Sequence, residues 1–213
     1  MAPIEFTGGM RFISRDGSHP PALREAIVEV DRDVAVAVDG LPACTVSSRD
    51  AVARRRVCRK AIVGWGTAAI ELAFPEEEPV RVRIPITLFN LGARGRSIRL
   101  VAYGSIPIPR PAGIAATIDV RPVPGGRGGW RATAKVPVIA GGSGSLIEVR
   151  LRVDRTYVSD TRAQKSFVSA RCPDGRFEVT MPKLLFVNES QTPGVPPSTV
   201  LKDKILLACT QRS

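Results

Sequence analysis

Apolar and polar residues alternate along much of the chain, which is the pattern of strands with one buried and one exposed face. In the run 80–89 the even positions carry branched apolar residues, and in the run 147–154 the odd positions do, while polar or charged residues fill most of the positions between them. Such alternation is typical of antiparallel sheets, so both runs are predicted strands whose charged faces point outward. Pro85 cannot donate a hydrogen bond to a ladder, and it therefore favours an edge position or a bulge.

Further strand patterns lie between clusters of proline and glycine. They cover 4–14, 26–30, 34–38, 62–74, 98–108, 113–120, 130–139, 165–172, 176–187 and 200–209. Gly8 and Gly9 make the first of these a bulged strand or a hairpin, and the turn at 172–175 joins the strands on either side of it in a second hairpin. The spacing predicts an all-β fold, an antiparallel β-sandwich of about ten to twelve strands. The chain needs only one domain, 1–213, or two packed subdomains within it.

One helix is predicted among the strands, from Ser48 to Lys60. Ser47 and Asp50 stand in the capping-box arrangement that begins a helix. Beyond the cap, one helical face is apolar and consists of Ala53, Val57, Cys58 and Ala61. The arginines point away from that face: Arg54, Arg55, Arg56 and Arg59. The helix is therefore amphipathic, with a strongly basic outer face.

Two groups of motifs resemble those of a known protein family. The first is Gly40-Leu41-Pro42-x-Cys44, Cys58, and Ala61-Ile62-Val63-Gly64-x-Gly66-Thr67; the second is Ala134-Lys135-Val136-Pro137, Ile139-Ala140-Gly141-Gly142 and the two distal cysteines. Over roughly 20–210 the chain resembles uncharacterised exported, disulfide-containing β-rich proteins of high-GC Gram-positive (actinobacterial) bacteria. The resemblance rests on structural motifs and implies no known activity. Members usually begin with a cleavable signal peptide. Residues 1–30 lack the basic and apolar regions of such a peptide, so we expect a mature form with an added Met1 or a misread start.

The four cysteines fit neither a CxxC pair nor the spacing of a zinc site. Of the three pairings that they allow, nearness in sequence favours Cys44 with Cys58 and Cys172 with Cys209, and buried free thiols are the alternative. Disulfides form in oxidising compartments, so the predicted location is extracellular or in the cell envelope. No run of eighteen apolar residues predicts a membrane-spanning segment.

The chain is strongly basic, with 31 Lys and Arg against 20 Asp and Glu and a net charge of +11. This charge favours an anionic partner, although GC-rich codon usage is the plainer explanation of the arginines. We expect a non-enzymatic structural or binding protein of the cell envelope or extracellular matrix that contacts an anionic polymer, partly through Arg54, Arg55, Arg56 and Arg59. The alternative is a carbohydrate-binding or carbohydrate-degrading module, against which the aromatic content of 5% argues. Edge strands are a candidate surface for self-association.

No catalytic, metal or cofactor constellation is visible in the sequence. The acids of 31–39 and 76–78 lie in predicted turns and match neither a calcium loop nor a pair of carboxylates in contrasting environments. The Gly-Gly-Ser-Gly-Ser run 141–145 lacks the Gly-Lys of a phosphate loop and the final glycine of a nucleophile elbow, so it is predicted to be a plain loop. A hydrolase would need a serine or an aspartate to converge in space on His19, the only histidine. We therefore predict no enzymatic activity, no cofactor and no metal.

Overall fold

The computed structural model describes residues 1–14, 16–44, 58–74, 76–107, 111–123, 129–159, 161–173, 175–188 and 197–208. Within these ranges the chain forms two short 3-10 turns, η1 (Arg59–Ala61) and η2 (Ala140–Gly142), and a series of strands. The strands are β1 (Ala2–Pro3), β2 (Phe6–Arg11), β3 (Ala22–Val30), β4 (Val34–Val36), β5 (Ile62–Leu72), β6 (Val80–Arg94), β7 (Ser97–Ile106), β8 (Ala112–Pro122), β9 (Trp130–Lys135), β10 (Gly144–Val153), β11 (Thr156–Val158), β12 (Gln164–Ser166), β13 (Val168–Ala170), β14 (Arg176–Val187) and β15 (Ser198–Ala208). Every pairing between these strands is antiparallel, so the predicted all-β, antiparallel class is confirmed.

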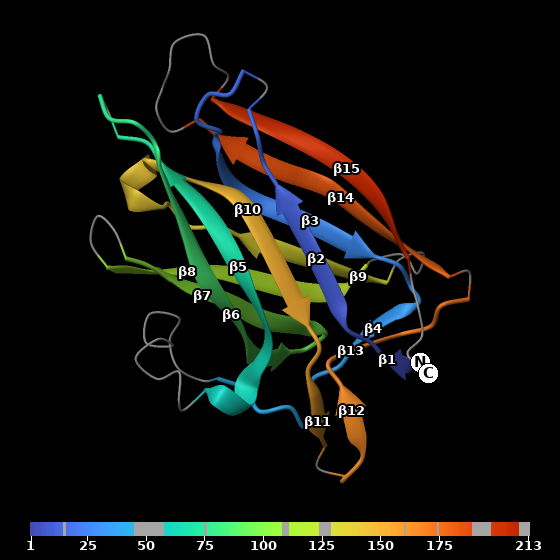
Figure 1. The fold of residues 1–213 in the computed structure, drawn as a ribbon. Coiled ribbons are helices and arrows are strands. Elements are labelled where there is room, and N and C mark those ends of the chain that lie inside the picture. The colour runs from blue at the N-terminus through green and yellow to red at the C-terminus, as the bar shows by residue number, and fades with distance from the viewer. Residues whose placement is uncertain are drawn as a thin grey trace.

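Ten strands form one sheet in the order β15-β14-β3-β9-β8-β7-β6-β5-β10-β2. Figure 1 shows that this sheet is strongly curled, and β2 and β15 are the strands at its two edges. The expected sandwich of two facing sheets is not confirmed, because the long strands all belong to the single curled sheet. Alternation requires only that one face of each strand be buried, and a curled sheet meets that requirement as well as two packed sheets do.

Two small sheets, with orders β1-β13-β4 and β11-β12, lie beside the large one (Figure 1). Phe167, Val168 and Ala170 from this region are buried in one cluster with Leu88 and Leu100, whose strands belong to the large sheet. The small sheets therefore cover one end of the curled sheet. The predicted hairpin across 172–175 is wrong, because β13 pairs with β1 and β4 whereas β14 pairs with β3 and β15.

Close approach of backbones explains the glycines of β5. A Cβ atom at Gly64 or Gly66 would collide with the backbone oxygen of Arg152 or Arg150 on the adjacent β10. Pro85 lies in β6, a central strand, so the expected edge position is wrong. It is tolerated where the pairing of β6 with β7 stops, since that ladder begins at Ile86.

The predicted bridge between Cys44 and Cys58 is present, and both cysteines are buried. They pack with Phe89 and Val101 on the outer face of the large sheet. The chain thus has a second apolar core outside the curl.

Cys172 is also disulfide-bonded, whereas Cys209, the partner predicted for it, lies outside the described residues.

Most of the predicted helix Ser48–Lys60 also lies outside the described residues. Its last part, from Cys58 onward, is described and leads into the 3-10 turn η1 rather than an α-helix. The helix prediction is therefore not confirmed.

Candidate functional site

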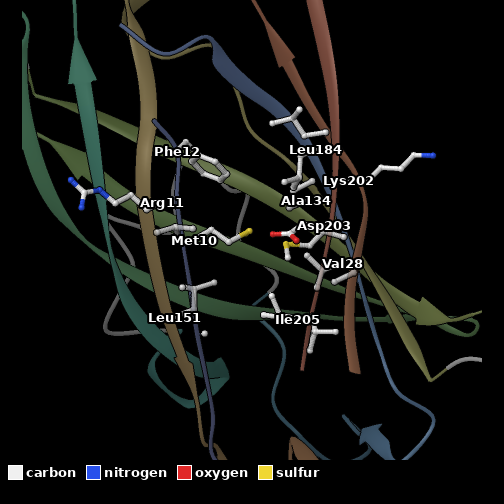
Figure 2. Close-up of a pocket in the computed structure, with 18 of the residues that line it drawn as sticks. Met10, Arg11, Phe12, Val28, Ala134, Leu151, Leu184, Lys202, Asp203 and Ile205 are labelled. Atoms are coloured by element: carbon white, nitrogen blue, oxygen red, sulfur yellow. The ribbon is translucent and has the colours of Figure 1, made fainter. Parts of the chain in front are cut away.

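The curled sheet encloses an apolar cavity of about 990 Å³ (Figure 2). Residues of both edge strands border it, together with residues of β3, β9, β10 and β14. Small side chains create much of this space, because Ala26 on β3 lies directly opposite Ala134 on β9 and Ala132 is the next inward residue of β9. Larger side chains at these positions would fill the interior, as they do elsewhere in the sheet.

Aromatic packing connects the two sides of the cavity. Phe12, which follows β2, and Phe186 of β14 both line it, and their rings meet edge to face with centroids 5.4 Å apart. Such pairs contribute about 0.5–1.5 kcal/mol beyond their burial. This contact links the segment after the edge strand β2 to β14, the neighbour of the other edge strand β15, although β2 and β15 do not pair.

The cavity is open to solvent along β15. Leu201 and Ile205 line it, yet they are 52% and 38% exposed. Edge strands rarely expose large apolar side chains, because such surfaces promote aggregation. Where they are exposed, they commonly mark a binding site.

Asp203 stands between these two apolar residues on the inward face of β15. Figure 2 shows Asp203 and Met10 pointing toward one another across the cavity, whereas Arg11 and Lys202 point away from it. Among the described residues that line the cavity, Asp203 is the only acidic one. The site therefore combines an extended apolar surface with a single inward carboxylate.

A second polar cluster lies on the outer face of the sheet. Ser145 on β10, Glu71 on β5 and Arg81 on β6 are directly opposite one another in register. His19, from the loop between β2 and β3, contacts this row through both ring nitrogens. Its Nδ1 lies 2.9 Å from Oε1 of Glu71, and its Nε2 lies 3.0 Å from Oγ of Ser145.

Local structure holds the loop that carries His19. Oδ1 of Asp16 accepts hydrogen bonds from both the backbone N–H and the hydroxyl of Ser18, and these bonds lower the pKa of Asp16. Pro20 and Pro21 follow His19 and restrict the backbone on its other side. The imidazole is thus presented to the sheet by a constrained turn.

Glu71 is almost fully buried, and burial alone would raise the pKa of its carboxyl group. Hydrogen bonds and charges from Arg81 and His19 outweigh burial, so the pKa of Glu71 lies below its ordinary value of 4.5. Nε of Arg81 donates to Oε2 at 2.8 Å, while Oε1 faces the imidazole. The carboxylate is therefore ionised at neutral pH.

This shift predicts a pH dependence of stability. Because the pKa of Glu71 is lower in the folded state, its contribution to the free energy of unfolding is fully present above pH 4.5 and is lost as the pH falls through the folded-state pKa. We expect Glu71→Gln to destabilise the protein at pH 7, with a deficit relative to wild type that shrinks below pH 4.5. Urea denaturation across pH 3 to 7 measures it, and a deficit that is constant with pH would contradict the assignment.

The structure tests only part of the predicted polyanion site. Arg54, Arg55 and Arg56 lie outside the described residues, and Arg59 is exposed in η1. On the outer sheet face several arginines have acidic partners, for example Arg152, which contacts Glu5 and Asp154 at 3.0 and 2.9 Å. The patch therefore stays a prediction.

Sequence reasoning missed both sites. Glu71 and Ser145 are 52 and 126 residues away from His19 in sequence, so no local motif reveals that they converge on it. Ser145 belongs to the glycine-rich run 141–145, and the prediction of a plain loop there is wrong in part, because Gly144 and Ser145 begin β10. Strands were predicted at 4–14 and 200–209, but nothing in the sequence placed them at the two borders of one cavity.

Among the described residues, no helix is long and apolar enough to cross a membrane, and no group of His, Cys, Asp and Glu is arranged to hold a metal ion. Comparisons with protein-family models, with curated proteins and with solved structures give no match for this chain. The resemblance to exported actinobacterial proteins therefore stays an expectation, and function is argued from the site alone.

Proposed function

We propose that the protein binds an elongated amphipathic molecule, whose apolar chain lies inside the curled sheet between β2 and β15. The observation that carries this proposal is the apolar cavity of about 990 Å³. Its volume lies at the upper end of the range of about 300–1,000 Å³ typical of small-molecule sites, and its walls are mostly apolar with few polar groups, as in such sites.

The exposed side chains of β15 support the same function. An occupant of the cavity would cover Leu201 and Ile205, which are otherwise exposed to water. Burial of apolar surface contributes about 0.8 kcal/mol per CH₂ group, so affinity should rise about fourfold for each added methylene until the cavity is filled.

The carboxylate of Asp203 favours ligands with an uncharged or cationic head group. An acidic head group entering between Leu201 and Ile205 would meet a like charge at the solvent-exposed border of the cavity. A hydroxyl or ammonium group would instead find a hydrogen-bond acceptor. The proposed ligand class is therefore long-chain alcohols, their neutral esters and alkylamines, rather than fatty acids.

Displacement of Nile red from the purified protein tests this function. We expect dodecanol and dodecylamine to displace the dye at concentrations at least about tenfold lower than dodecanoate, a difference of 1.4 kcal/mol. Asp203→Asn should reduce this selectivity, because it removes the charge and keeps the shape. Equal displacement by all three compounds would contradict the role of Asp203, and failure of every compound to bind would contradict the proposed function.

An extracellular or cell-envelope location is part of the proposal and is supported by the Cys44–Cys58 disulfide. Contact with an anionic polymer remains a separate prediction. Self-association through β15 is disfavoured at the centre of the strand, because antiparallel pairing of two copies about Asp203 would place Lys202 opposite Lys204 of the other copy.

A further inference from the structure

The outer face of the sheet carries a second arrangement with the geometry of a catalytic site. Ser145 Oγ, His19 and Glu71 form a continuous chain of two contacts, of 3.0 and 2.9 Å. These distances fall within the range of hydrogen bonds between a nucleophile, a base and the group that orients the base.

The direction of the two hydrogen bonds follows from the ionised carboxylate. Glu71 can only accept, so Nδ1 of His19 carries a proton and donates to Oε1, and Nε2 is the unprotonated nitrogen whenever the imidazole is neutral. Nε2 is then the acceptor, and it receives the hydroxyl proton of Ser145. This tautomer is the one that activates a serine hydroxyl.

We propose that Ser145, His19 and Glu71 are the nucleophile, general base and orienting acid of a site that cleaves small carboxylic esters by acyl transfer. Arg81 holds the second oxygen of Glu71 at 2.8 Å and is a positioning residue. The site lies on the opposite face of the sheet from the apolar cavity, so it is independent of the ligand proposed above.

A shallow depression of about 300 Å³ lies beside this row of residues, and of the row only Arg81 is among the described residues that line it. Ala69, the outward residue of β5 that precedes Glu71, lines it as well. Arg11 and Arg83 also line it, and Glu148, the single acidic residue among the described lining residues, lies 3.8 Å from Arg83. An excess of guanidinium groups favours an ester that carries an anionic group, because charge-assisted hydrogen bonds to carboxylates are strong.

The reaction uses only the groups present and water. Oγ of Ser145 bonds to the ester carbonyl carbon while its proton passes to Nε2 of His19. The bond from carbon to the alcohol oxygen then breaks, and the alcohol leaves with that proton. Water attacks the acyl-serine with the same base, releasing the carboxylic acid and restoring the hydroxyl.

The backbone next to Ser145 limits the rate. Amide groups of Gly142, Ser143 and Gly144 already donate to the carbonyl oxygens of Ile139 and Ala140, so they are not free to stabilise an oxyanion. Loss of a single such donor lowers turnover by about 10²–10³ in enzymes that have one. Ser145 is also only 2% exposed, and His19 covers it with a side chain that is 26% exposed. Slow turnover of activated esters is therefore expected, with an acyl-serine that can be trapped.

Covalent labelling of the wild-type protein tests the site. We expect phenylmethylsulfonyl fluoride to modify one residue, Ser145, as read by peptide mass mapping. Ser145→Ala should abolish the label, and His19→Gln should slow it at least about 100-fold. Ser143→Ala is the matched control and should be labelled like wild type.

Activated esters test the predicted substrate class. Mono(4-nitrophenyl) succinate should release nitrophenolate about tenfold faster than the neutral 4-nitrophenyl 4-methylpentanoate, a preference that Arg83→Gln should lower. Equal rates would overturn the anionic substrate class. If the wild-type protein is folded by circular dichroism but is not labelled at Ser145, the proposed triad is wrong and the three residues form only a structural hydrogen-bond network. This outcome does not depend on whether the variants fold.

Discussion

Ala134→Trp is expected to abolish the binding of long-chain alcohols and amines while leaving the protein folded. Ala134 lies on β9 between Ala26 of β3 and Ile118 of β8, and all three line the cavity. An indole at this position would occupy the space that the ligand needs. Because the site is a cavity rather than a packed core, the substitution should avoid the 1–3 kcal/mol that overpacking commonly costs. Nile red displacement and thermal unfolding measure the two effects.

Thr133→Trp is the matched control for this substitution. Thr133 is the neighbouring residue of β9, and its side chain points to the other face of the sheet. The control should retain binding close to that of wild type. Unchanged affinity in Ala134→Trp, or an equal loss in both variants, would show that the ligand does not enter the cavity.

Phe89→Ala is expected to lower the free energy of unfolding by about 3–5 kcal/mol, the usual cost of removing a buried phenylalanine. Phe89 is 1% exposed and packs with the Cys44–Cys58 bridge and Val101 outside the curled sheet. Urea denaturation measures the loss. Phe74→Ala, at a partly buried position of another cluster, should cost less, and a loss below about 1 kcal/mol for Phe89→Ala would contradict a second core beneath the disulfide.

Phe89 also shows where sequence reasoning reached its limit. Alternation along 80–89 correctly predicted β6, and it assigned position 89 to the outward face. The structure keeps that assignment but buries the ring, because the segment bearing Cys44 and Cys58 covers this part of the outer face. Periodicity reports which residues share a face, and only tertiary structure decides what covers it.

Pairing between strands that are distant in sequence was equally unpredictable from the pattern. The pattern located most strands within a few residues, since each strand is specified by its own alternation. It could not tell that β3 pairs with β14 and β9, or that β2 pairs with β10, because these contacts join distant segments. For the same reason the single curled sheet was predicted as a sandwich, and its cavity was not predicted.

The disulfide was predictable because its cysteines are close in sequence and bracket one segment, with a separation of 14 residues. The site around His19 was not, although its requirement was clear: a serine and an acid had to reach the imidazole. Ser145 and Glu71 meet that requirement only because β10 and β5 are neighbours in register.

Photo-crosslinking with a long-chain alcohol that carries a diazirine along its chain tests the central claim most directly. After irradiation of the wild-type protein, peptide mass mapping should find the label on inward residues around the cavity, such as Met10, Leu184 and Ile205, and excess dodecanol should suppress it. Label confined to the outward residues of the sheet, or label that excess dodecanol leaves unchanged, would contradict binding inside the curled sheet.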